Sequence, residues 1–317
     1  MSLTLCYKAL SDDSRLRILK ALSRSSFSVQ ELTQILNITQ STVSHHLKVL
    51  TQAGMVESQK NGTWVYYRLC EPNNSSSDQS IGATLIDQFI SLSKSNPVSA
   101  FNGLSSTFES DDKTIEKILE EKRDELKKFF DSAAPRWKSI REQVVGHDSY
   151  FHEVLKYIRR DETLLELGCG SGAFLDALLP RPGATIAVDY SESMLEAAKK
   201  NLGRKADGAD LRLGYLEHLP VANSSVDVTV SYMVMPFIRD PKIVLNDVYR
   251  ALKNVGRIIL VESGLLETDP SCYPTENLPR APINQIMHWL KTVGFQAVES
   301  KEISKDVFLI IGTKTYE

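Results

Sequence analysis

One segment of eleven residues, LLELGCGSGAF from Leu164 to Phe174, constrains the fold of this chain more than any other. Its apolar run ends on Glu166, and glycines then occupy alternate positions at Gly168, Gly170 and Gly172. Because glycine has no Cβ, the backbone can turn sharply there and a ligand can approach it closely. The segment therefore predicts a buried strand that ends in a tight, ligand-binding loop.

The chain around this segment alternates between strand-like and helix-like stretches. The apolar patterns predict strands over residues 163–168, 184–191, 210–214, 226–233 and 256–263. Helices are predicted over 171–179, 191–202, 241–253 and 282–295, and a terminal hairpin over 296–303 and 306–314. This alternation indicates a doubly wound α/β sheet, parallel and covered on both faces. Such sheets bind ligands beyond the carboxyl ends of their strands.

Two carboxylates accompany the glycine loop. Asp189 ends the second predicted strand, 21 residues after Gly168, and a carboxylate there can accept hydrogen bonds from both hydroxyls of a ribose. A dinucleotide site would favour G-x-G-x-x-G opening directly onto a helix N-terminus. This loop is G-x-G-x-G, and the acidic Glu166 before it suits a ligand with a positive amine in place of a phosphate. A redox protein that binds a dinucleotide is the less favoured alternative.

A different pattern occupies the first 70 residues. Two short helices are predicted over residues 4–22, a third over 28–36 and a fourth over 40–54, with a three-residue turn between the last two. Val43, Leu47 and Leu50 share one face of the fourth helix, and Gly54 ends it. Two short helices joined by such a turn form the helix-turn-helix pattern.

The other face of the fourth helix is polar and can meet base edges and phosphates. Its outward residues are Gln40, Ser41, Ser44, His45 and Lys48. The segment MVESQKNGTWVYYRL, residues 55–69, then predicts a β-hairpin around Asn61-Gly62, and a hairpin directly after a recognition helix is a wing. Lys60 and Asn61 lie at its tip, where they can meet a phosphate or the minor groove. A solvated helix face and a purely structural hairpin are the simpler alternatives.

The two patterns define a division of the chain. A polar loop over residues 71–80 is followed by an amphipathic helix over 80–95 and a long charged helix over 112–130. We therefore predict three parts. Residues 1–95 form a winged helix-turn-helix domain, mainly α with a β-hairpin wing, residues 96–135 form a helical linker, and residues 136–317 form the α/β domain.

Composition narrows the class of protein. The net charge of −3 is unevenly spread, with nine Lys and Arg against seven Asp and Glu in residues 1–100. No apolar run of 18 residues and no signal-peptide pattern is present, so we expect no membrane span and a cytoplasmic location. The four cysteines are far apart and follow no spacing pattern, which fits free thiols in a reducing compartment.

Residues 1 to about 94 resemble the ArsR-type winged-helix repressors, bacterial dimers that often release DNA when an effector binds. The motifs ALSDDSRLRILKAL, STVSHHLKVL and NGTWVYYRL carry the resemblance. It implies binding to double-stranded operator DNA and a homodimer formed through the N-terminal domain, in part through the helix over residues 80–95. Many members bind metal through a cysteine pair, but the matching positions are Ser28 and Gln30, which cannot supply thiolates. We therefore predict no metal site.

Residues from about 125 to 313 resemble the class I S-adenosylmethionine (SAM) methyltransferases that act on small molecules. The motifs are LLELGCGSG, IAVDYSESMLEAAKK, LEHLPVANSSVDVTVSYMV and DPKIVLNDVYRALKNVGRIILVE. The resemblance implies that this domain binds SAM or S-adenosylhomocysteine (SAH). The implied binding residues are Glu166, Gly168, Cys169, Gly170, Gly172, Asp189, Tyr190, Met194, Tyr215, Leu216 and Trp137.

The same resemblance implies a role for most of these residues. Glu166 and the first two glycines would meet the amino-acid part of the ligand, and Asp189 the ribose. Met194 would pack near the adenine, with Tyr215 and Leu216 along its edge. Trp137 lies in FFDSAAPRWKSI, which resembles the segment that closes over the ligand in relatives.

Departures from the family pattern leave the chemistry open. Tyr215 stands where many relatives have an acidic residue, and the apolar Met235, Pro236 and Phe237 stand where many have a histidine pair. No catalytic residue is therefore predicted. The fusion resembles SAH-responsive ArsR-type regulators, which implies a transcriptional regulator of SAM-cycle or methionine genes with SAM or SAH as effector. The alternative is an active SAM-dependent methyltransferase with a DNA-binding head.

Overall fold

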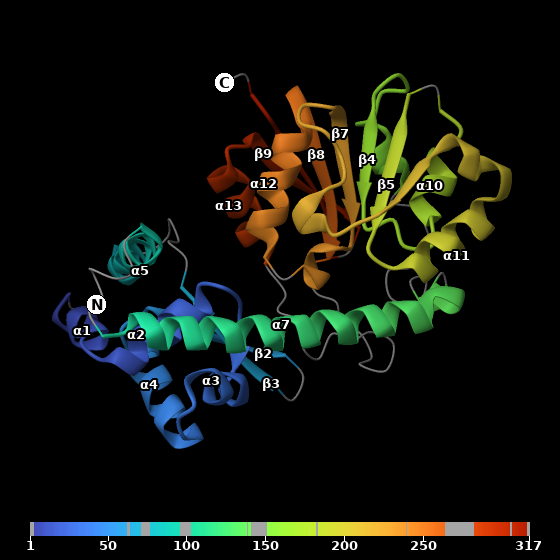
Figure 1. The fold of residues 1–317 in the computed structure, drawn as a ribbon. Coiled ribbons are helices and arrows are strands. Elements are labelled where there is room, and N and C mark those ends of the chain that lie inside the picture. Colours follow the sequence, from blue (N-terminus) through green and yellow to red (C-terminus); the bar gives the residue numbers. More distant parts are fainter. Residues whose placement is uncertain are drawn as a thin grey trace. The chain divides into compact units, whose positions relative to one another are not determined.

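The computed structural model describes residues 3–61, 64–70, 77–95, 103–137, 139–140, 151–181, 183–238, 240–263, 282–304 and 306–315. The chain forms two compact units, and among the described residues the boundary falls between Asp124 and Glu125. It lies within α7 (Ser105–Ala133), which Figure 1 shows as one unbroken helix. The residues of the predicted linker that form α7 are thus divided between the two units.

The N-terminal unit has the predicted order of helices, turn, helix and wing. Its elements before α7 are α1 (Leu3–Leu10), α2 (Asp13–Leu22), β1 (Phe27–Ser28), α3 (Val29–Leu36), α4 (Gln40–Gln52), β2 (Val56–Asn61), β3 (Trp64–Leu69) and α5 (Ser77–Ser95). The strands form an antiparallel sheet in the order β1-β3-β2. The last pair of the β2–β3 ladder is Asn61 with Trp64, so Asn61 still belongs to strand β2, and Gly62 of the predicted turn lies outside the described residues.

Local hydrogen bonds set the helix starts in this unit. The side chain of Asp12 accepts from the N–H of Arg15 and caps α2, and Thr39 caps α4 in the same way. Ser28 and Glu31 form a reciprocal capping box at the start of α3. Asn37, in the turn between α3 and α4, has a left-handed backbone with φ of 52°. Short polar residues at these positions therefore define the helix-turn-helix.

One continuous core holds the N-terminal unit together. Val43, Leu47 and Leu50 of α4 are buried in it, as predicted. Helix α5 contributes its face with Ile86 and Phe89, and α7 adds three apolar residues of its own. The α7 residues in this core are Ile115, Ile118 and Leu119. The first half of α7 is thus part of the domain core.

The C-terminal unit is the predicted α/β domain. Its elements after α7 are η1 (Ala134–Arg136), α9 (Phe151–Leu155), β4 (Leu164–Leu167), α10 (Ala173–Leu178), β5 (Thr185–Asp189), α11 (Glu192–Leu202), η3 (Gly203–Gly208), β6 (Asp210–Leu213), η4 (Leu216–His218), β7 (Val226–Tyr232), η5 (Met235–Phe237), α12 (Pro241–Ala251), β8 (Leu252–Ser263), α13 (Ile283–Val293), β9 (Gln296–Ser304) and β10 (Val307–Thr313). None of the helices in the described part of the chain is long and apolar enough to cross a membrane.

The seven strands follow the order β6-β5-β4-β7-β8-β10-β9. The five strands from β6 to β8 run parallel, and the terminal hairpin of β9 and β10 adds two antiparallel neighbours. One prediction was wrong at its boundary. Helix α12 ends at Ala251 and β8 begins at Leu252, because Leu252 already pairs with Val226 of β7.

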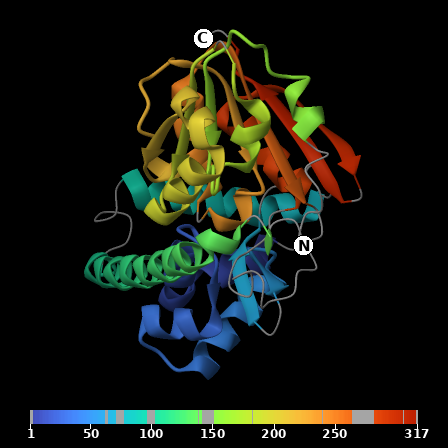
Figure 2. The same cartoon turned by 90° about the vertical axis from the view of Figure 1, so that its right-hand side faces the viewer.

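Helices cover both faces of this sheet, as the turned view in Figure 2 also shows. Helices α9, α10 and α11 pack on one face with Leu164 and Ala187 of the central strands. Helices α12 and α13 pack on the other face with Leu165 and Leu167. Strand β4 has β5 on one side and β7 on the other, so the chain adds strands on one side of β4 first and then on the other. The glycine loop follows β4 at this switch point, where doubly wound sheets bind ligands.

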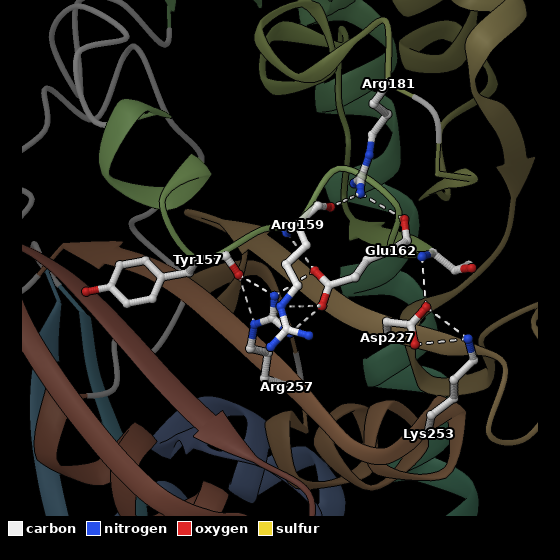
Figure 3. A network of polar contacts seen from close by, with 8 residues as sticks. Tyr157, Arg159, Glu162, Arg181, Asp227, Lys253 and Arg257 are labelled. Atoms are coloured by element: carbon white, nitrogen blue, oxygen red, sulfur yellow. Dashed lines mark hydrogen bonds and ion pairs between the residues drawn. The ribbon is translucent and has the colours of Figure 1, made fainter.

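A network of charged groups joins the chain before β4 to strands β7 and β8 (Figure 3). The carboxylate of Glu162 accepts two hydrogen bonds from Arg257, at 2.8 and 2.7 Å, and one from the N–H of Arg159 at 2.7 Å. Asp227 accepts from Lys253 at 2.9 Å. Burial opposes the ionisation of Glu162, but its bonds to Arg257 and Arg159 hold its pKa below the usual value. The network therefore stabilises the sheet at the amino ends of β4 and β7, whereas the glycine loop follows the carboxyl end of β4.

We expect Glu162→Ala to lower the free energy of unfolding by about 3 kcal/mol, because the largely buried guanidinium of Arg257 loses its carboxylate. For a unit of this size, that corresponds to a fall in melting temperature of roughly 6–12 °C by calorimetry. Because folding lowers the pKa of Glu162, its contribution should be present at neutral pH and be lost as the pH falls below the ordinary value of a glutamate. The control is Glu299→Ala, an exposed position on β9. Equal melting temperatures for the two variants would contradict this role.

Candidate functional site

The glycine loop has a backbone that other residues rarely adopt. Gly168, Gly170 and Gly172 have φ values of 63°, 51° and 79°. A Cβ on Gly168 would lie 2.8 Å from Cγ2 of Val234, and one on Gly170 would lie 3.1 Å from Nε1 of Trp137. Backbone conformation therefore favours glycine at all three positions, and the space beside Gly168 is too small for a Cβ unless Val234 moves.

Asp189 ties this loop to the end of β5. Its Oδ2 accepts the N–H of Gly170 at 2.8 Å, and its Oδ1 accepts the N–H of Ser191 at 3.0 Å. A carboxylate offers about four lone-pair sites, so each oxygen can accept a further hydrogen bond. Burial raises the pKa of Asp189 to about 6, against the effect of the N–H donors of Ser191 and Gly170.

Two more buried carboxyl groups lie at the carboxyl ends of parallel strands. Glu166 of β4, Asp189 of β5 and Glu262 of β8 are 3%, 6% and 2% exposed. Glu262 accepts the N–H groups of Val234 and Met235, each at 3.1 Å, and burial raises its pKa to about 8. Glu262 was not predicted from the sequence. The signal was an acidic residue near the end of a predicted strand, the same one that identified Glu166 and Asp189.

An aromatic cluster lies beside the loop. Phe130, near the end of α7, makes edge-to-face contacts with Trp137, Tyr190 and Phe237 at centroid distances of 5.1, 6.1 and 5.1 Å. Met194 is buried in the same cluster. Trp137, predicted as a lid residue, therefore lies against Gly170 and Phe130. Phe130 was not predicted as a site residue, because it ends a charged helix that was assigned to the linker.

The remaining predicted ligand residues lie around this centre. Tyr215 is 46% exposed, and its ring stacks on Tyr190 with centroids 6.2 Å apart and planes inclined by 28°. Leu216 is partly buried against the core on the α12 side of the sheet. Cys169 is buried, and burial raises the pKa of its thiol well above the usual value, so it is not a reactive thiolate. Cys6, Cys70 and Cys169 are free thiols.

A hydrogen-bonded chain leads from Asp189 to α7. Ser191, whose N–H donates to Asp189, caps α11 by accepting from the N–H of Met194 at 3.1 Å. Its hydroxyl donates to Oδ1 of Asp131 at 2.6 Å, and Lys127 donates to Oδ2 of Asp131 at 2.9 Å. The end of α7 is thus two hydrogen bonds away from the buried carboxylate of Asp189.

The residues of this site fit SAM or SAH. The glycine backbone leaves no room for a Cβ, and the spare acceptor sites of Asp189 suit a ribose diol. The buried carboxyl of Glu166 suits a positive amine. Within the described residues, no group of three or more His, Cys, Asp or Glu side chains is placed to hold a metal ion. Which atoms of the ligand each residue meets stays a prediction.

The candidate DNA surface lies on the other unit. The five side chains predicted to face outward on α4 are all exposed, namely Gln40, Ser41, Ser44, His45 and Lys48. Lys60 is exposed near the end of β2, and the side chain of Asn61 lies outside the described residues. His46 is buried, and its Nδ1 lies 3.8 Å from Oδ1 of Asp12.

Two family models match the chain. The model of the bacterial regulatory protein arsR family matches residues 12–58, and that of a methyltransferase domain matches residues 165–260. The matched ranges lie in the two different units.

Each of the curated relatives matches only part of this chain. The arsenite methyltransferase of Halobacterium salinarum is 32% identical over 151 residues, which are 44% of this chain and 38% of the relative. The arsenical resistance operon repressor of Bacillus subtilis is 44% identical over 64 residues, 20% of this chain and 61% of the repressor. The chain thus spans less than two thirds of both. It covers 74% of an HTH-type transcriptional regulator of Methanocaldococcus jannaschii, with 41% identity over 66 residues, 20% of this chain.

One solved structure agrees with the methyltransferase fold of the C-terminal unit. A chain in the complex between the Haloferax volcanii Trm112 methyltransferase activator and a methyltransferase matches with a TM-score of 0.50 and 17% identity. The match covers 59% of this chain and 98% of that one. At this identity the likeness concerns the fold alone.

Proposed function

Because the chain belongs to the arsR family of bacterial regulatory proteins and carries a methyltransferase domain, we propose that it is a transcriptional regulator whose methyltransferase domain binds SAM or SAH as its effector. The proposal rests chiefly on the glycine loop with Glu166 and Asp189, in a chain whose other unit exposes a polar recognition helix. This regulator would act in the cytoplasm, where it would meet its operator DNA. The regulated genes would be those of the SAM cycle or of methionine supply.

The proposed regulator acts as a homodimer. Leu3 and Tyr7 are 50% and 58% exposed and lie one turn apart on α1, and Leu92 of α5 is 52% exposed. Large apolar side chains that stay exposed on two neighbouring helices support burial against a second copy. A symmetric dimer would present two recognition helices to half-sites about 34 Å apart.

In the proposed site each residue has a separate task. Asp189 would accept the ribose hydroxyls, Glu166 would face the amine, and the glycine backbone would approach the amino-acid part of the ligand. Met194, Tyr190, Tyr215 and Leu216 would line the adenine, and Trp137 would cover the loop. Bound SAM would supply an electrophilic methyl group, whereas SAH has none.

The second candidate function is methyl transfer to a small molecule. It is favoured by the similarity to a relative named arsenite methyltransferase. Proximity and orientation alone can support methyl transfer, so the absence of a predicted base does not exclude it. Transfer of radiolabel from SAM to a cell extract distinguishes this enzyme from a pure sensor.

The proposal is tested by fluorescence anisotropy of the full-length protein on the DNA upstream of its own gene, titrated separately with SAH and SAM. We expect one ligand to change the DNA Kd by about 5- to 150-fold. If neither ligand changes DNA binding, the sensor proposal fails and methyl transfer becomes the leading function.

Lys48→Ala should weaken DNA binding, because one phosphate contact is lost. The slope of log K against log salt concentration should fall by about one unit. The control is Lys200→Ala, an exposed position on α11 in the other unit.

A further inference from the structure

The first half of α7 is joined to α2 by a row of ion pairs. The buried carboxylate of Asp111 accepts from Nε and Nη2 of Arg17, both at 2.7 Å. Lys20 pairs with Asp112 at 2.6 Å, and one turn further along α7 Glu116 pairs with Arg24. The bidentate geometry of the first pair fixes orientation as well as distance. Three ion pairs therefore hold this half of α7 against α2.

Lys122 of α7 also contacts the helix-turn-helix and the wing. Its Nζ lies 2.5 Å from Oε1 of Glu31, the residue that closes the capping box of α3. The same ammonium lies 5.4 Å from the ring centroids of both Phe27 of β1 and Tyr66 of β3. One side chain of α7 thus contacts α3 and two strands of the wing sheet.

The last turns of α7 contact the ligand site. Asp131 accepts from Ser191, whose N–H donates to Asp189, and Phe130 packs on Trp137 and Tyr190. A ligand held by Asp189 or covered by Trp137 would therefore act on groups that α7 contacts directly. The two ends of a single helix are thereby attached to the predicted ligand residues and to the predicted DNA-binding elements.

We propose that α7 is the coupling element, so that a ligand engaging Asp189 alters the Ser191–Asp131 contact and an unbroken α7 carries the change to α2, α3 and the wing. The inference rests on the proposed sensor function. A ligand shifts the equilibrium between a DNA-binding and a DNA-releasing state of the protein only if its affinity for the two states differs. A continuous helix can transmit this shift because it moves as a rigid element. The coupling should then require both the helix and its Asp131 contact.

The test interrupts α7 where the two units divide. Glu125 is exposed on α7 directly after the boundary, so its replacement disturbs neither core. Glu125→Pro removes a helical hydrogen bond and kinks the helix, whereas the matched control Glu125→Ala retains it. DNA Kd is measured by anisotropy with and without saturating SAH on the full-length proteins, and SAH Kd by calorimetry. We expect Glu125→Pro to bring the ratio of the two DNA Kd values close to one, and Glu125→Ala to keep the wild-type ratio.

The outcomes separate this inference from the proposed function. A wild-type protein whose DNA Kd responds to neither SAH nor SAM contradicts both. A responsive wild-type protein with an equally responsive Glu125→Pro variant overturns only the role of α7. If Glu125→Pro fails to bind DNA or SAH, Asp131→Asn decides, because it weakens the contact to Ser191 and leaves the helix intact. An unchanged ratio in Asp131→Asn overturns the inference, and a reduced ratio supports it.

Discussion

Gly170→Val should weaken the binding of SAH by about 100-fold, measured by calorimetry on the full-length protein. At φ of 51° a β-branched residue is strained, by roughly 1–3 kcal/mol, and the loop would leave its present conformation. The new Cβ would also meet the indole of Trp137 at 3.1 Å. The N–H of Gly170, which donates to Asp189, would move with the loop.

The matched control for this variant is Gly203→Val. Gly203 also has a positive φ, 54°, but a Cβ there has no heavy atom within 4 Å, and it follows α11, outside the glycine loop. This variant should suffer comparable strain and bind SAH as the wild type does. If both valine variants bind SAH with wild-type affinity, Gly170 does not contribute to a ligand cradle.

Asp189→Asn should weaken SAH binding by about 10- to 150-fold, the loss of one charge-assisted hydrogen bond to a buried group. Asp189 accepts from Gly170 and Ser191 with different oxygens. Asparagine has only one oxygen, so its NH₂ group would face one of these N–H donors. The variant thus loses a ribose acceptor and a loop contact together.

The pH dependence of SAH binding gives a second readout at Asp189. Because burial raises the pKa of Asp189 to about 6, its carboxylate form predominates above that pH and is lost as the pH falls through it. The wild-type affinity should therefore be about tenfold lower at pH 5 than at pH 7. Asp189→Asn should remove this dependence, and Asp176→Asn, at an exposed position on α10, should retain it. A pH profile that is the same in the wild type and in Asp189→Asn would contradict the assignment.

Local patterns predicted much of this fold. The helix starts are set locally, since Asp12, Thr39 and Ser191 each accept a hydrogen bond from a backbone N–H three residues further along the chain. The wing strands and the parallel strands followed from apolar patterns within single segments. Strand β1 was missed, since its two residues, Phe27 and Ser28, are too few to show an alternation.

The sequence by itself determined the two kinds of domain, their order and the glycine loop with Glu166 and Asp189, because each depends on residues close together in the chain. Only the tertiary structure decided which side chains surround that loop. Phe130 and Phe237 are far apart in sequence and meet at 5.1 Å, and Glu262 of β8 contacts Val234 beside Gly168. Contacts of this kind depend on strand order and on how helices pack on the sheet, and no short-range pattern records them. For the same physical reason the charged residues of α7 indicated only a helical linker. In the folded chain Asp111 and Lys122 pair with residues of the N-terminal unit, and Asp131 pairs with Ser191 of the C-terminal unit.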